Sequence, residues 1–108
     1  MSTRALRLLA VVVLLVVVVG NPIKDVRNPY IQELGGWAVS EYLRQSHSDG
    51  LLYGQVTSCE QYNAYKLTGV NYNLVLDAMD TTATVKNYRA IVLIKRRGTR
   101  VLKSFQLA

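Results

Sequence analysis

One stretch of the sequence has helical periodicity, and the segments after it alternate in the manner of β-strands. The stretch opens at Asn28-Pro29, a strong helix start, because Asn caps well and Pro fits the first helical position. An apolar stripe then recurs at helical spacing through Ile31, Leu34, Ala38 and Tyr42. This pattern predicts a helix over residues 29–46. Within it, Gly35-Gly36 costs up to about 1 kcal/mol per glycine, but two small residues also allow a helix to sit close to a sheet.

Four strand-like segments follow the predicted helix, at residues 52–65, 70–79, 85–94 and 101–107. They are rich in Val, Tyr and Thr, and turn-forming or charged runs such as Asp80-Thr81-Thr82 separate them. Short connections between neighbouring strands imply antiparallel hairpins. With a further short strand near Ile23, the order of elements predicts an α+β fold, in which an antiparallel sheet of four to five strands packs on one long helix.

The first 20 residues have the pattern of a targeting segment. Arg4 and Arg7 precede 12 unbroken apolar residues, 8–19, and a membrane span needs about 20. A basic start with a short apolar run is typical of a secretory signal peptide, and Val18 and Gly20 allow cleavage after Gly20. We therefore expect a signal peptide over residues 1–20, one domain over 21–108, and a secreted protein, extracellular or vacuolar, without membrane contact after cleavage. An uncleaved anchor or a buried strand is the alternative.

The charge balance is basic but does not identify a partner. The chain of 108 residues carries 13 Lys+Arg against 7 Asp+Glu, a net charge of +6. Without Arg4 and Arg7 the balance falls to +4, which favours acidic partners at long range. Residues 95–103 form a basic group that suggests nucleic-acid binding, but this group has no interleaved aromatic residues. With the signal peptide ahead of it, we expect no nucleic-acid partner.

Residues for catalysis or metal binding are scarce. The chain has one cysteine, Cys59, and one histidine, His47, which lies in a polar run typical of a loop. One Cys and one His do not fill a zinc shell, and no Gly-rich phosphate loop is present. A lone cysteine forms no internal disulfide and is more often a small buried hydrophobe than a nucleophile. We therefore expect a monomer that has no cofactor and no enzymatic activity.

Five strings of residues match one known family in order and in spacing. They lie at residues 22–26, 34–42, 69–76, 85–92 and 102–105. In the helix string, Leu34, Ala38, Val39 and Glu41 match the plant signature of that family outright. Over about residues 20–108, the chain resembles the plant cystatins, which are protein inhibitors of papain-like cysteine proteases.

The resemblance implies a fold, a partner and a contact surface. It implies an antiparallel sheet wrapped around one helix, with a papain-like cysteine protease as the partner. Family inhibitors act as a rigid wedge, in which a glycine-bearing N-terminal strand and two hairpin loops fill the protease cleft reversibly. The residues that it assigns to protease contact are Gly20, Tyr65, Lys66, Leu67, Thr68, Gly69, Arg96 and Arg97.

The sequence departs from the family at this wedge. The first family loop reads Gln-Xaa-Val-Xaa-Gly, and residues 65–69 keep only its glycine, Gly69, which serves either a tight turn or protease contact. Because the strand ahead is about two residues longer than usual, Gln61 is an alternative match for the family's Gln, with an insertion after it. The second family loop carries Pro-Trp, and Arg96-Arg97 stands there. These departures imply weak inhibition, with a non-inhibitory interaction or structural module of the same fold as the alternative.

Overall fold

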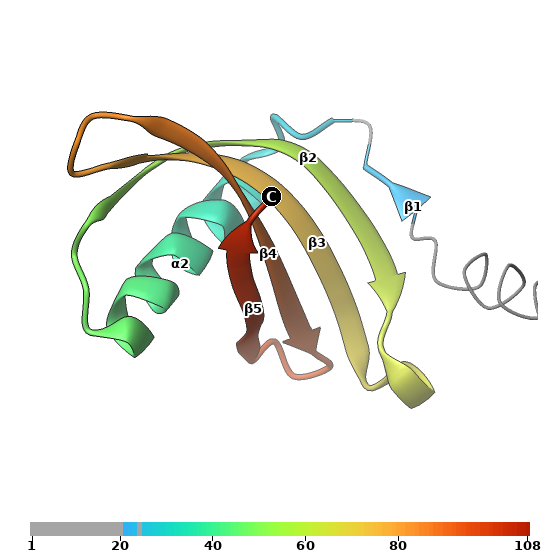
Figure 1. The fold of residues 1–108 in the computed structure, drawn as a ribbon. Helices are drawn as coiled ribbons and strands as arrows, with labels where there is room; N and C mark the ends of the chain where they lie inside the picture. The colour runs from blue at the N-terminus through green and yellow to red at the C-terminus, as the bar shows by residue number, and fades with distance from the viewer. Residues whose placement is uncertain (1–20, 24) are drawn as a thin grey trace, which may run out of the picture.

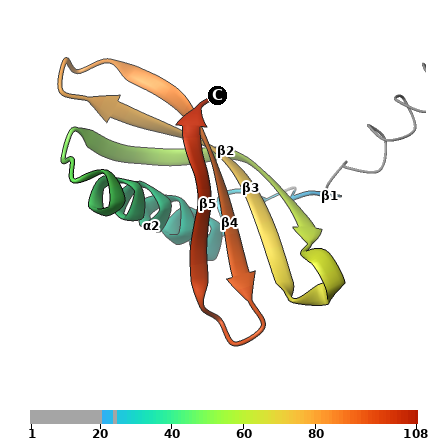
Figure 2. The same cartoon turned by 60° about the horizontal axis from the view of Figure 1, so that its bottom comes forward.

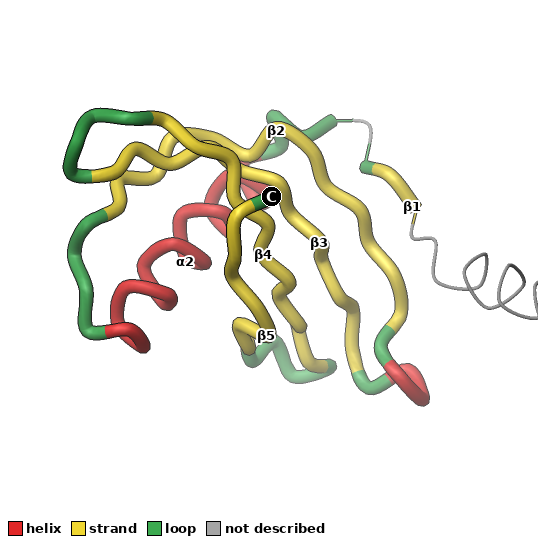
Figure 3. The backbone as a smooth tube through the Cα atoms, in the orientation of Figure 1, coloured by secondary structure: helices red, strands yellow, loops and turns green. Residues whose placement is uncertain are grey.

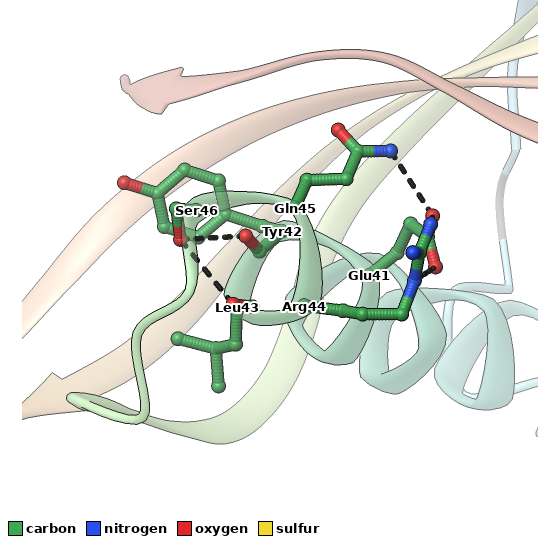
Figure 4. Close-up of polar contacts among 6 residues, drawn as sticks. All are labelled: Glu41, Tyr42, Leu43, Arg44, Gln45 and Ser46. Carbon is green, nitrogen blue, oxygen red and sulfur yellow. Dashed lines mark hydrogen bonds and ion pairs between the residues drawn. The ribbon is translucent and has the colours of Figure 1, made fainter.

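The helix forms over the residues that its pattern predicts. The computed structural model describes residues 21–23 and 25–108, so the predicted signal segment, with Gly20, lies outside the described residues. Helix α2 spans Pro29–Ser46. The Asn28 side chain caps it by accepting from the Tyr30 backbone N–H at 2.9 Å. In the last turn, Glu41 pairs with Arg44 and accepts from Gln45 (Figure 4). Among the described residues, no helix has the length and apolarity of a membrane span.

Five strands form one antiparallel sheet in chain order. They are β1 (Asn21–Pro22), β2 (Leu51–Asn63), β3 (Gly69–Asp80), β4 (Val85–Lys95) and β5 (Arg100–Leu107). The α+β fold predicted from the sequence is confirmed, including a short strand near Ile23. One boundary was wrong, because β2 ends at Asn63 and Tyr65 begins a short 3₁₀ helix, η1 (Tyr65–Leu67). Left-handed backbone at Lys66 and Leu67 (φ 54° and 56°) is incompatible with an extended strand.

The sheet curves around α2, as Figures 1 and 2 show, and the core lies between them. The predicted stripe residues Ile31, Leu34 and Ala38 are buried against Val56, Leu74, Leu76 and Val92 of the sheet. Gly35 permits the close approach, since a Cβ there would lie less than 3.0 Å from the Val56 side chain. Tyr42, the last residue of the stripe, is half-buried and stacks on Phe105 with ring centroids 4.3 Å apart.

Strand β2 absorbs two extra residues in bulges. Its 13 residues lie opposite only the eleven residues 70–80 of β3. The register shifts between Tyr53 and Val56 and again between Val56 and Ser58, and each bulge adds one unpaired residue to the strand. The extra length therefore lies in the middle of β2. Gln61 sits within the strand, opposite Tyr72, and therefore outside the connection from β2 to β3.

Gln32 of α2 fills the gap that the bulges open in the ladder. Its Oε1 accepts from the Val56 N–H at 3.0 Å and from the Tyr53 hydroxyl at 2.6 Å. Its Nε2 donates to the carbonyl oxygen of Val56 at 3.1 Å and to that of Val26 at 2.6 Å. Val56 is only 2% exposed, so its peptide groups depend on this amide. Gln32 thereby ties the helix both to β2 and to the segment that follows β1.

Candidate functional site

Three segments that are distant in the sequence meet at one end of the sheet. The connection from β2 to β3 (residues 64–68) and that from β4 to β5 (residues 96–99) turn at the same end, as Figures 2 and 3 show. The pairing of Gly69 with Lys95 places the start of β3 beside the end of β4. β1 runs antiparallel to β2 with Asn21 opposite Gln61, so β1 begins toward this end. We call the two connections, residues 64–68 and 96–99, the paired loops.

The first of the paired loops is a closed, curled turn. The Leu67 N–H donates to the Ala64 carbonyl at 2.9 Å, and the Ala64 N–H donates to the Gly69 carbonyl at 3.0 Å. Left-handed backbone at Lys66 and Leu67 costs roughly 1–2 kcal/mol per residue. The side chain of Leu67 is 63% exposed. The turn therefore holds a large apolar side chain out to solvent in a strained but hydrogen-bonded backbone.

Gly69 is required by close packing of two backbones. It does not adopt a left-handed conformation, so the tight-turn reading of this glycine is wrong. A Cβ at this position would lie less than 3.0 Å from the Ile94 carbonyl oxygen and 3.0 Å from the Lys95 Cα. Backbone atoms do not yield as a flexible side chain does. Gly69 therefore lets β3 start directly against β4, which sets the separation of the paired loops.

The second of the paired loops is bonded to the first through the backbone. The Lys95 N–H donates to the Thr99 carbonyl at 2.9 Å, and the Gly98 N–H donates to the Lys95 carbonyl at 2.8 Å with Gly98 at φ 90°. The Arg96 N–H donates across to the Thr68 carbonyl at 3.2 Å. The side chains of Arg96 and Arg97 are exposed. The structure thus brings Lys66, Leu67, Thr68 and Gly69 together with Arg96 and Arg97, and Gly20 lies outside the described residues.

A shallow groove of about 370 Å³ lies where the paired loops meet. Its walls come from the ends of β2, β3 and β4 and from both loops: Asn63, Leu67, Gly69, Val70, Tyr72, Ile94, Lys95 and Arg96. Leu67, Val70 and Ile94 make it largely apolar, and Lys95 and Arg96 add positive charge. An apolar side chain with a carboxylate nearby is the chemistry that fits such a groove.

Arg100, the first residue of β5, braces the second loop against the helix. Its guanidinium donates to both carboxylate oxygens of Glu33, at 2.8 and 2.6 Å. Its Cζ lies 5.9 Å from the Tyr30 ring centroid and 5.7 Å from that of Trp37. The hydrogen bond from Arg100 lowers the pKa of Glu33. An exposed pair of this kind contributes about 1 kcal/mol or less, so its main effect is to fix where β5 starts. No local pattern of residues indicates this contact, because it joins positions 67 residues apart.

Cys59 belongs to the core. It is 2% exposed, and burial, with a contribution from Glu60, raises the pKa of its thiol to about 11. A thiol in that state is a poor nucleophile. His47 is the left-handed cap at the end of α2 (φ 52°). Among the described residues, no three His, Cys, Asp or Glu side chains lie close enough together to hold a metal ion.

Comparison with known proteins identifies a family of inhibitors. A family model described as aspartic acid proteinase inhibitor matches residues 23–108. Cysteine proteinase inhibitor 8 of Oryza sativa subsp. japonica is 45% identical over 89 residues, which cover 82% of this chain and 69% of that protein. Cysteine proteinase inhibitor 6 of the same organism is 40% identical over 108 residues, which cover 97% of this chain and 93% of that protein. Cysteine proteinase inhibitor 5 of Arabidopsis thaliana is 42% identical over 72 residues, covering 67% and 56%.

These names disagree on the class of proteinase, because the family model names aspartic enzymes and the relatives name cysteine enzymes. They agree on the kind of protein, and the five-stranded antiparallel sheet around one helix is the cystatin arrangement. The chain therefore belongs to the plant family of cystatin-like proteinase inhibitors.

Proposed function

We propose that the protein is a reversible inhibitor of papain-like cysteine proteases, and that the paired loops enter the protease cleft. The observation that carries this proposal is the bond from the Arg96 N–H to the Thr68 carbonyl, which joins two hairpins into one rigid edge. A surface that is ordered before docking loses little conformational entropy on binding. The curled backbone at Lys66 and Leu67 also offers no extended segment for cleavage. Relatives named cysteine proteinase inhibitors support the same reading.

We expect this protein to bind its target protease more weakly than other inhibitors of the family do. Among the paired-loop residues whose burial the structure describes, Leu67 is the large hydrophobic residue with a mostly exposed side chain. Arg96 and Arg97 stand where the family carries Pro-Trp. Loss of an aromatic anchor commonly costs about 2 kcal/mol, or roughly thirtyfold in affinity. If cleavage follows Gly20, the N-terminal strand would begin at Asn21, and this third part of the wedge would be shorter than in the family.

Arg97→Trp tests this function most cleanly. A proline at position 96 would remove the N–H that bonds Thr68, so the tryptophan is introduced alone. We expect the inhibition constant against a papain-like protease to fall severalfold, with activity recovered on dilution. Arg89→Trp is the matched control, since Arg89 is exposed on β4 outside both loops. Equal effects of the two variants, or no inhibition by any of the proteins, would contradict the proposal.

A second candidate function is inhibition of an aspartic proteinase, which the description of the matching family model favours. The same protein is therefore titrated in parallel against a pepsin-like enzyme. Inhibition of that enzyme alone would replace the cysteine protease by an aspartic one as the target. Inhibition of neither would favour the third reading, an interaction or structural module of the same fold.

We further propose that the protein is secreted after cleavage following Gly20. The support is the sequence of residues 1–20, in which Arg4 and Arg7 precede the apolar run. N-terminal sequencing of the exported protein should give Asn21 as the first residue. A product that retains Met1 inside the cell would contradict this proposal.

A further inference from the structure

Positive charge gathers on and beside the paired loops. Lys66, Lys95, Arg96 and Arg97 are all exposed at this end of the sheet. Residues 61–76 and 81–108 contain no Asp or Glu. Within the described part of the chain, no carboxylate forms an ion pair with Lys95, Arg96 or Arg97, and the nearby Arg100 already takes both oxygens of Glu33.

Three of the seven acidic residues lie near the β3–β4 hairpin. Asp49 and Asp80 line one shallow surface hollow beside the β3–β4 hairpin, and Asp77 lies three residues before Asp80 on β3. In Figure 1 this hairpin lies at the far end of the sheet from the paired loops. The surface proposed to dock therefore carries several exposed positive charges. Such a field orients an approaching partner and raises the association rate when the partner is acidic.

We propose that the paired loops select proteases whose active-site cleft has an acidic rim, with Arg96 and Arg97 contacting carboxylates on that rim. This inference rests on the proposed function and specifies its target by charge. A guanidinium binds a carboxylate through two parallel hydrogen bonds, and the groove beside Arg96 accepts an apolar neighbour of that carboxylate. Arg96 and Arg97, which stand where the family has Pro-Trp, would thus provide selectivity for acidic targets in place of an apolar contact.

The test compares two papain-like cysteine proteases, one with an acidic cleft rim and one with a neutral or basic rim. Association rates are measured for the parent, for Arg96→Gln/Arg97→Gln, and for Arg27→Gln/Arg89→Gln, which removes the same charge from exposed positions outside the loops. In 0.1 M salt we expect the loop variant to associate about fivefold more slowly with the acidic protease. In 1 M salt the Debye length falls to about 3 Å, and the difference should disappear.

Each of several results would overturn the inference. Equal slowing with both proteases, equal slowing in the control variant, or a difference that survives 1 M salt would each show that the loop arginines do not select for charge. If the parent inhibits both proteases equally well, the proposed function stands and this inference fails. If the parent inhibits neither, the proposed function fails with it.

Discussion

Gln32→Met removes the amide that completes the bulged strand β2. Methionine is unbranched, similar in length and a good helix former, so helix propensity changes little. The variant loses four hydrogen bonds, two of which satisfy the N–H and carbonyl of buried Val56. The remaining two partners, the Tyr53 hydroxyl and the Val26 carbonyl, belong to residues that are only partly buried and can be solvated by water.

The expected cost follows from these partners. An unsatisfied buried donor or acceptor costs about 1–3 kcal/mol, so two such groups give roughly 2–6 kcal/mol. For a small domain this is a large share of the free energy of unfolding. Converted with a urea m-value of about 1–3 kcal/mol/M, a loss of 3 kcal/mol lowers the unfolding midpoint by roughly 1–3 M.

Urea unfolding followed by the fluorescence of Trp37 measures the effect. Gln45→Met is the matched control, because Gln45 lies on the same helix but is exposed and donates only to Glu41 (Figure 4). The control should change stability by no more than about 0.5 kcal/mol. If the two variants unfold at the same urea concentration, Gln32 does not satisfy the bulge and the reasoning is wrong.

Three further variants test the paired loops and the opposite hairpin. Leu67→Asn should raise stability by up to about 1 kcal/mol, because Asn tolerates left-handed backbone, and weaken inhibition about tenfold; loss of stability measured in urea would contradict this. Gly69→Ala should lower the free energy of unfolding by about 2 kcal/mol or more, because the new methyl group would clash with the Ile94 carbonyl. A methyl group at Gly50 would make only ordinary contacts, so Gly50→Ala should unfold like the parent. Hydrogen bonds from the Thr82 hydroxyl and then the Thr84 N–H lower the pKa of Asp80 to about 2. Because the pKa of Asp80 is lower in the folded protein than in the unfolded chain, where it is near 3.9, its ionised carboxylate stabilises the folded protein above about pH 4. The stability advantage of the parent over Asp80→Asn should therefore shrink as the pH falls from about 4 to 2. An advantage that grows on acidification would refute this prediction.

The local patterns of the sequence predicted the helix and the strands well, because these elements depend mainly on residues that are neighbours in the sequence. Asn28-Pro29 marked the helix start, and the alternation of β3 and β4 marked two strands within one residue of their ends. The strings that match the family also located the two connections that the structure brings together. The contacts that support this edge were not predictable, because they join distant residues. Gln32 meets Val56 across 24 positions and Arg100 meets Glu33 across 67.

The reason for Gly69 was likewise hidden in the sequence. A glycine between two strands suggests a turn, and only the pairing of Gly69 with Lys95 reveals that a neighbouring backbone excludes a side chain. The left-handed backbone at Lys66 and Leu67 could not be predicted either, since neither Lys nor Leu favours that conformation. Strand pairing and loop strain arise from tertiary structure, whereas periodicity reports only local preference.

Hydrogen–deuterium exchange of the complex tests the central claim most directly. The protein is mixed with a papain-like cysteine protease whose catalytic cysteine is replaced by alanine, and amide exchange is compared with that of the free protein. The account predicts slower exchange at residues 64–68 and 96–99, with the end of α2 and the β3–β4 hairpin unchanged. Protection confined to that hairpin or to the helix, or no protection at the highest soluble protease concentration, would contradict it.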